Sequence, residues 1–245
     1  MLTRKDLRIV IIEARLDQAM IDHEHHCIVR AGKLAPEQVV PVSILPDGPD
    51  VSILDQYHAV ILGGTGDYSV VEDHLKFYEP LLSFTRLCLE RGIPTLGLCY
   101  GHQIMAQALG GVVKTVHELE ETGTYEMVLT PEGRRDPLLA DLPDRFPAQQ
   151  GHHDAVQSMP AEFLRLAYSE RCQWQGMKHR DKPFYGFQFH PELTRDDLVQ
   201  RMNTYAHVYA SQPGKLESII ASIKFTDNQS VIANFIDKAV MPTLR

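Results

Sequence analysis

The sequence lacks long apolar runs and dense basic stretches, and each absence excludes a class of protein. The first apolar run, residues 9–12, is interrupted by Glu13 and is too short for a signal-peptide core or a membrane span. Acidic residues outnumber basic ones by 32 to 24, which gives a net charge of −8 and disfavours a nucleic-acid surface. We therefore expect a cytoplasmic protein without a membrane or nucleic-acid partner.

Paired cysteines are also absent. Four cysteines are spread along 245 residues, and none forms a Cys-x-x-Cys pair. This spacing provides neither a disulfide framework nor a zinc knuckle, so we expect reduced thiols. They are Cys27, Cys88, Cys99 and Cys172.

One predicted helix, over residues 17–31, carries two pairs of potential metal ligands at i, i+4 spacing. One pair is His23 with Cys27, and the other is Asp22 with His26. No second ligand cluster completes a four-coordinate site, so the sequence favours a solvated helix face with an interior contact at Cys27. We expect no bound metal.

Short apolar strands alternate with helices in the first half of the chain. The predicted strands are 7–12, 39–45, 59–62 and 95–98, and the predicted helices are 17–31, 73–91 and 101–109. Strands that are apolar throughout, alternating with helices, indicate a parallel sheet with both faces covered. We therefore expect an α/β fold with an open, mostly parallel sheet of the flavodoxin or Rossmann type.

After residue 111 the pattern changes to short strands separated by turns. These are predicted at 112–116, 124–129, 155–158, 164–168, 172–178 and 184–189. They indicate a small antiparallel extension and the last strands of the main sheet. A largely helical tail follows at 195–245. No linker or internal repeat interrupts the chain, so we expect one domain over residues 1–245.

Cys99 stands where a predicted strand meets a predicted helix. Gly97 and Gly101 lie two residues on either side of it, which is the spacing of a nucleophile elbow. The sharp turn strains the backbone of the nucleophile, and side chains at the flanking positions would clash with neighbouring elements. The N-terminus of the following helix favours the thiolate form. The sequence therefore predicts that Cys99 is a nucleophile rather than an inert buried thiol.

A candidate base follows another predicted strand, in the segment 187–192. Glu192 can lie on the same side of an extended backbone as His190, two residues earlier. A carboxylate bonded to one imidazole nitrogen fixes the tautomer and leaves the other nitrogen to face a thiol. We expect a Cys-His-Glu triad.

Together these motifs resemble those of the class I (triad-type) glutamine amidotransferases. Segment 97–103 is similar to the family's nucleophile motif, and segment 187–192 is similar to its His-x-Glu motif. Segment 63–67, Gly-Gly-Thr-Gly-Asp, resembles the oxyanion loop commonly written Gly-Gly-Pro-Gly. Segment 150–156 is similar to the family's His-Gly-Asp-x-Val segment. Four motifs in the right order form a far more specific match than any one of them.

The resemblance implies a role for each matching residue. Cys99 would attack the side-chain carboxamide of glutamine. His190 would protonate the departing ammonia and then activate water, and Glu192 would orient His190. The backbone N–H groups of Gly64 and Tyr100 would form the oxyanion hole, and two donors aimed at the tetrahedral oxygen are what this chemistry requires.

Four further residues are expected to contact substrate on the same grounds. They are Gly66, Gln103, His152 and His153. Two positions depart from the family pattern. Thr65 replaces the usual proline, which adds an N–H and loosens the oxyanion loop. His153 replaces a small glycine, and it either narrows the substrate mouth, selects a different amide donor or is a solvent-facing loop residue.

The glycine loop 63–66 has little in common with a nucleotide-binding loop. It lacks the Lys-Ser/Thr ending of a P-loop and the third glycine of a dinucleotide fingerprint. We therefore expect no nucleotide cofactor and no other cofactor.

Three functions remain open at this point. The first is hydrolysis of the glutamine amide through a γ-glutamyl thioester, with release of ammonia. The second is a stand-alone γ-glutamyl hydrolase or peptidase, which the substitution at His153 makes worth testing. The third is a non-catalytic regulatory protein, which has no physical need for an intact triad. Roughly 50 residues follow Glu192, too few for an ordinary synthetase domain, so we expect any ammonia-accepting synthetase on another chain.

Overall fold

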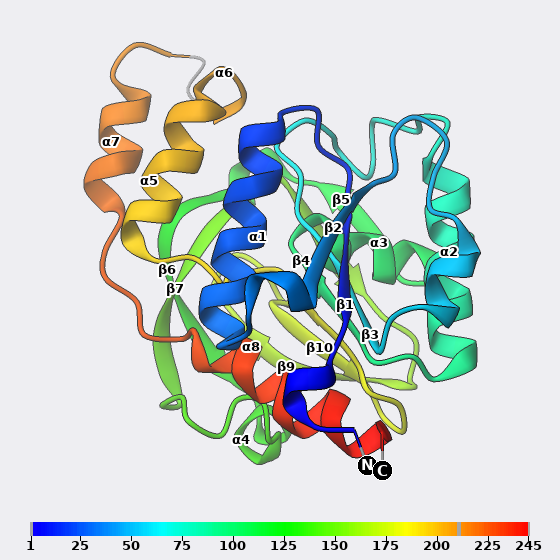
Figure 1. The fold of residues 1–245 in the computed structure, drawn as a ribbon. Coiled ribbons are helices and arrows are strands. Elements are labelled where there is room, and N and C mark those ends of the chain that lie inside the picture. The colour runs from blue at the N-terminus through cyan, green and yellow to red at the C-terminus, as the bar shows by residue number, and fades with distance from the viewer. Residues whose placement is uncertain (1, 210–211, 245) are drawn as a thin grey trace.

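The computed structural model describes residues 2–209 and 212–244, and a nine-stranded sheet forms its centre (Figure 1). The strand order across the sheet is β2-β1-β3-β4-β11-β10-β9-β6-β7. In that order the strands span Val39–Ser43, Ile9–Glu13, Ala59–Leu62, Thr95–Leu98, Phe184–Phe187, Gly176–His179, Phe163–Tyr168, Glu121–Leu129 and Arg145–His152. A separate antiparallel pair consists of β5 (Val112–Thr115) and β8 (Asp154–Ser158).

The first five strands of this order are parallel and carry the N-terminal helices. Successive residues of β1 divide between two apolar cores, because side chains alternate between the faces of a strand. Helix α1 (Gln18–Gly32) packs into one core, and α2 (Tyr78–Arg91) and α3 (Tyr100–Ala108) pack into the other. The predicted α/β fold, with helices on both faces of the sheet, is confirmed.

The other four strands extend the same sheet in antiparallel fashion. Most of this extension follows the predicted strands, although β10 begins only at Gly176. The sequence pattern does not predict β7, because this segment contains Pro147 and Gly151 and has no β-branched residue. Pairing with β6 along its whole length forms the strand despite this composition.

Helix α2 is shorter than predicted. It begins at Tyr78 instead of residue 73, since residues 73–77 are not helical and belong to the loop that follows β3. It ends at Gly92, whose φ of 67° is the left-handed conformation that glycine adopts readily. The loop between β3 and α2 carries the predicted oxyanion loop.

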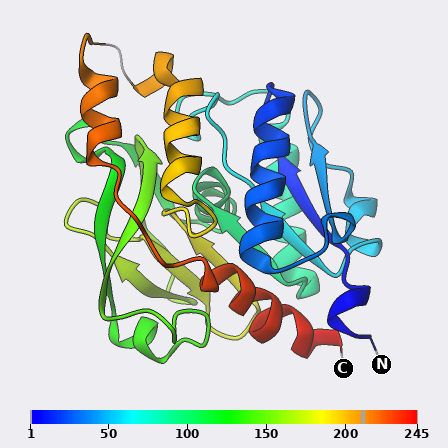
Figure 2. The same ribbon diagram turned by 60° about the vertical axis from the view of Figure 1, so that its left-hand side comes forward.

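The C-terminal tail is largely helical, as predicted. Its helices are α5 (Arg195–Thr204), α6 (Ala206–Tyr209), α7 (Lys215–Ser222) and α8 (Ser230–Asn234), followed by a π-helical turn (Phe235–Val240) and a 3-10 turn (Met241–Leu244). Figure 2 shows α5 and α7 side by side beyond α1, while α8 packs against α1 from below. Buried residues of α5, α6 and α7 form a third apolar core with residues of α1. None of the described helices, tail included, combines the length and apolar character needed to cross a membrane.

Gly101 gives the first prediction, since it lies so close to β3 that an added methyl group would overlap the Leu62 carbonyl. Gly101→Ala should lower the free energy of unfolding by about 1–3 kcal/mol, the usual cost of overpacking. The matched control is Gly32→Ala, whose methyl group would meet flexible ends of side chains. Chemical denaturation of both variants checks this, and equal effects would contradict the close packing described for Gly101.

Candidate active site

The nucleophile elbow has the strained geometry that its sequence predicts. Cys99 connects β4 to α3 with φ 51° and ψ −100°, a conformation that side-chain-bearing residues seldom adopt. A methyl group on Gly97 would lie 2.7 Å from the Gly101 carbonyl carbon, and one on Gly101 would overlap β3. Both glycines are therefore needed for the turn, which presents Cys99 at the N-terminus of α3.

The pairing of β4 with β11 brings the candidate base to the nucleophile. Leu98 pairs with Phe187 in parallel register, so the residues that follow both strands emerge at the same edge of the sheet. There His190 Nδ1 lies 2.7 Å from Glu192 Oε1, and both side chains are buried. Burial favours the neutral imidazole, but the Glu192 carboxylate and the Cys99 sulfur favour the charged form and raise the pKa of His190 to about 9. The structure thus brings the three predicted triad residues together.

Two residues that sequence reasoning missed surround the sulfur. The side-chain amide of Gln188 lies 3.5 Å from Cys99 Sγ, and the carbonyl of Gly151 lies 3.7 Å from it. The same carbonyl accepts a hydrogen bond of 2.9 Å from the Tyr209 hydroxyl. Tyr209 belongs to the tail, more than 100 residues from Cys99 in sequence, and no local pattern marks it.

The two expected oxyanion donors differ in whether their N–H groups already have a hydrogen-bond acceptor. The N–H of Tyr100 lies in the first turn of α3, and none of the described residues accepts a hydrogen bond from it. The N–H of Gly64, in contrast, donates to Glu24 Oε1 at 2.9 Å. In this conformation a buried carboxylate on α1 thus holds the Gly64 N–H, and the role of this group as an oxyanion donor stays a prediction.

A cavity of about 220 Å³ opens in front of Cys99. The four expected substrate residues all line it: Gly66, Gln103, His152 and His153. Gly66 sits so close to the Tyr205 ring that no side chain would fit there. The tail closes part of the wall, through Val208 and Tyr209.

The polar residues of this cavity are held by neighbours. The Gln103 amide donates to the Asp154 carbonyl at 2.8 Å and to Gln188 Oε1 at 3.1 Å. His152 is buried, with Nε2 3.1 Å from Glu121 Oε2. These contacts fix the orientation of both side chains beside the sulfur.

His153 lines the cavity and is partly exposed. Its Nδ1 is 2.8 Å from Glu120 Oε2, and its ring stacks on Tyr209 with centroids 5.2 Å apart. The narrowing of the substrate mouth by this residue stays a prediction.

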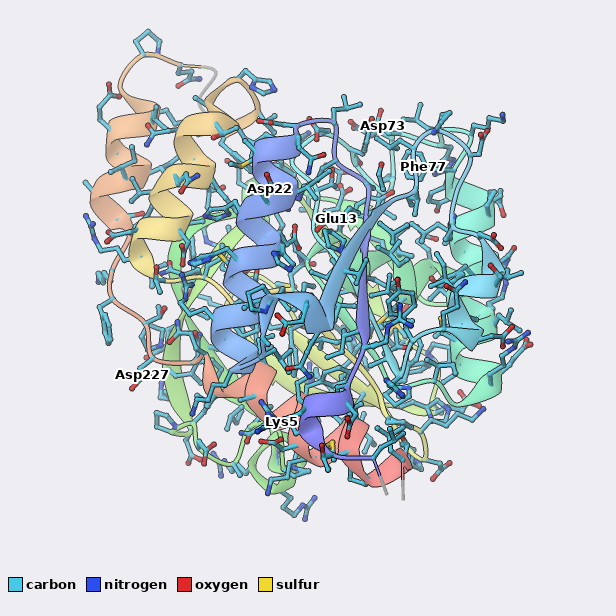
Figure 3. The ribbon with its side chains drawn as sticks, viewed as in Figure 1. Lys5, Glu13, Asp22, Asp73, Phe77 and Asp227 are labelled. Carbon is cyan, nitrogen blue, oxygen red and sulfur yellow. The ribbon has the colours of Figure 1, made fainter. Side chains whose placement is uncertain are left out.

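A cluster of buried charges beneath the oxyanion loop was not predicted. Glu24 pairs with Arg15 through contacts of 2.6 and 2.7 Å, and Arg15 also donates to the Tyr205 hydroxyl at 2.9 Å. Arg201, on α5, lies 3.4 Å from Glu192 Oε1 and 3.9 Å from Glu24 Oε2. Within this cluster, the sequence could have pointed only to Glu13 and Arg15, because charged residues at the carboxyl end of a buried strand are unusual (Figure 3 labels Glu13).

Within residues 2–209 and 212–244, two groups of side chains have the composition of a metal site. His23 and Cys27 are buried against Asp197 of α5, which corrects the expectation of a solvated face for His23; Asp22 is exposed on α1 (Figure 3). Asp197 is already bound by Arg30 and Thr194, and burial raises the pKa of Cys27 to about 12, so this group favours packing over metal binding. The second group consists of His117, Glu120 and His153; both histidines line the cavity, and Lys215 pairs with Glu120.

Comparisons with known proteins agree with this geometry. The family profile described as "Glutamine amidotransferase class-I" matches residues 20–202. The chain therefore belongs to the class I glutamine amidotransferase family, and it is a glutamine-hydrolysing enzyme of the α/β class.

Two kinds of relative show how widely the likeness extends. The chain is 33% identical over 156 residues to a glutamine-hydrolysing GMP synthase subunit from Methanopyrus kandleri, a match covering 63% of this chain and 77% of that protein. It is 32% identical over 161 residues to the corresponding protein from Methanococcus aeolicus, covering 64% and 78%. A crystal structure of a glutamine amidotransferase from Thermotoga maritima superposes with a TM-score of 0.68 at 21% identity, covering 96% of this chain and 98% of that one. This last likeness concerns the fold.

The raised pKa of His190 leads to a prediction about stability. The folded-state pKa of about 9 lies above the value of about 6.5 expected in the unfolded chain. Protonation of His190 therefore stabilises the fold fully below pH 6.5, and this contribution is lost as the pH rises through 9. The free energy of unfolding of the wild type, minus that of His190→Gln, should fall between pH 6 and pH 9.5. Urea titrations measure this difference in the free energy of unfolding. A difference that stays constant from pH 6 to pH 9.5 would contradict the raised pKa of His190.

Proposed function

We propose that Cys99, His190 and Glu192 hydrolyse the side-chain amide of free glutamine through a covalent thioester. The observation that carries the proposal is the 2.7 Å contact between His190 and Glu192, on an imidazole that also faces the Cys99 sulfur at a strained strand-to-helix turn. This arrangement supplies a nucleophile, a proton carrier and an orienting carboxylate within one buried site.

In the first half of the reaction, Cys99 Sγ attacks the δ-carbon of glutamine, and the carbonyl oxygen becomes an oxyanion. The protonated His190 gives its proton to the amide nitrogen as the C–N bond breaks, so ammonia leaves and a γ-glutamyl thioester remains. In the second half, His190 takes a proton from water, the resulting hydroxide attacks the thioester, and glutamate is released with the sulfur restored. Glu192 stays hydrogen-bonded to Nδ1 of His190 through both halves of the reaction.

Free glutamine suits the dimensions of the site. The cavity has a volume of about 220 Å³, and His153, stacked on Tyr209, lines it. The leaving group of a γ-glutamyl amine or peptide would have to share this space. The geometry therefore favours a leaving group as small as ammonia over the bulkier ones of a γ-glutamyl hydrolase.

The released ammonia is proposed to reach a synthetase on another chain. Support comes from relatives that are each named as one subunit of a GMP synthase, a name that implies a further subunit of that enzyme. The chain would then act as one glutaminase domain over residues 1–245, with its helical tail completing the active-site wall.

The nucleophile is tested by substitution. Cys99→Ala should lower kcat for ammonia release by at least about 10⁴-fold, because the covalent route is lost, while the melting temperature changes little. Cys88→Ala is the matched control, since it removes another buried thiol remote from the cavity and should keep its activity. Ammonia release by Cys99→Ala at the wild-type rate would refute the triad. Failure of a glutamine-mimicking diazoketone to label Cys99 in the wild type, seen by intact mass, would favour a non-catalytic protein.

The proposed narrowing of the substrate entrance by His153 predicts a substrate preference. The ratio kcat/KM for glutamine should exceed that for γ-glutamyl amines and dipeptides by at least about 10²-fold. His153→Gly should raise kcat/KM for the bulkier compounds by about 10-fold, because the imidazole no longer narrows the entrance. A wild-type preference for a γ-glutamyl amine or peptide would instead establish the hydrolase alternative.

A further inference from the structure

The peptide between Gly63 and Gly64 is held at both of its polar ends. Its carbonyl oxygen accepts a hydrogen bond of 3.2 Å from the N–H of Gly101, at the start of α3. Its N–H donates to Glu24 Oε1 at 2.9 Å. The C=O and N–H of a trans peptide point in opposite directions. The carbonyl therefore faces the helix that presents Cys99, and the N–H faces α1.

This orientation is opposite to the one that the chemistry needs. An oxyanion donor must point at the reacting carbonyl, which lies on the side of Cys99 and α3. One N–H cannot serve the Glu24 carboxylate and an oxyanion at the same time. Among the described residues, the Tyr100 N–H is thus the one free donor of the expected pair in this conformation.

Glu24 is built to hold this orientation. Its side chain is fully buried and binds Arg15 through two short contacts. Burial acts to raise the pKa of Glu24, but Arg15, Arg201 and the Gly64 N–H outweigh it and lower the pKa to about 2. The carboxylate is therefore charged at neutral pH, and hydrogen bonds to charged acceptors are markedly stronger than neutral ones.

We propose that Glu24 is a positioning residue that holds the Gly63–Gly64 peptide away from the reacting oxygen, and that rotation of this peptide accompanies glutamine hydrolysis. The proposal rests on the proposed function, since it concerns the oxyanion of that reaction. Breaking the bond between Gly64 and Glu24 then contributes to the barrier of the chemical step. The residue acts through the Gly64 amide and does not touch the substrate.

The loop has the freedom that such a rotation requires. Both residues that flank the peptide are glycines, which reach either sign of φ without a steric penalty. Thr65 follows in place of the proline that would fix the next φ angle. After rotation, Glu24 keeps its partners Arg15 and Arg201, so no unpaired buried charge is created.

A neighbouring carboxyl group provides a matched control. Glu13 is equally buried and lies 3.4 Å from Arg15, but it makes no hydrogen bond to the Gly64 N–H. Burial and the nearby charge of Glu24 raise the pKa of Glu13 well above its usual value. Glu13→Gln therefore changes a second carboxyl group of the same buried cluster, and it leaves the Gly64 contact intact.

The experiment compares three variants in a glutaminase assay without any partner protein. Glu24→Gln replaces the charged acceptor by a neutral one, and Glu24→Asp keeps the charge but withdraws it by one methylene. Both should raise kcat by about 10-fold, the ratio expected when a charge-assisted hydrogen bond becomes a weak one, with KM nearly unchanged. Glu13→Gln should leave kcat and KM at wild-type values. A fall in kcat, or no change, in a folded Glu24 variant would overturn the proposal.

Two further measurements keep the test decisive. Labelling of Cys99 by the glutamine-mimicking diazoketone is measured in every variant. Labelling without a rise in kcat overturns the role of Glu24 alone, whereas no labelling even in the wild type overturns the glutaminase function. If the Glu24 variants do not fold, the wild-type Gly64 amide is followed by NMR while glutamate γ-semialdehyde forms a tetrahedral adduct with Cys99. The Gly64 amide proton should shift strongly as it changes acceptor, and an unchanged resonance would contradict the proposal.

Discussion

The parallel pairing of β4 with β11 is the constraint on which the active site depends. Leu98 and Phe187 are paired across these strands, so the residues after them emerge together although about 90 positions separate them in sequence. A shift of this register by one residue would turn every side chain of β11 to the opposite face and move His190 away from the sulfur. The two glycines beside Cys99 then let α3 start immediately at the sheet edge, which places its N-terminus and the sulfur at one point.

Much of this could be predicted from the sequence, because the decisive motifs are local. Cys99 with its two glycines, and His190 with Glu192, each occupy a short segment that ends a predicted strand, and parallel strands end at a common edge. The buried charges could not be predicted in the same way. Glu24 and Arg201 lie far apart in sequence and look like ordinary helix-surface residues until α5 packs over α1. His23 was expected in solvent for the same reason, since its partner Asp197 comes from the tail.

The direction of the Gly64 N–H shows where local reasoning ends. The glycine loop predicts that a backbone donor is present, but the orientation of a peptide between two glycines depends on what lies on each side of it. Here the Gly101 N–H and the Glu24 carboxylate decide it. Arg201 connects this arrangement to the triad, as it approaches both Glu24 and Glu192 within one buried cluster. The tail therefore contributes a cation to the site as well as part of its wall.

The central claim is that Cys99 carries a γ-glutamyl group during turnover. The most direct measurement mixes the protein with glutamine, quenches the reaction in acid within the first turnovers and determines the intact mass. We predict a population heavier by one γ-glutamyl group, which peptide mapping assigns to Cys99 and which is absent before glutamine is added. Ammonia release with no such adduct, or an adduct on another residue, would contradict the account.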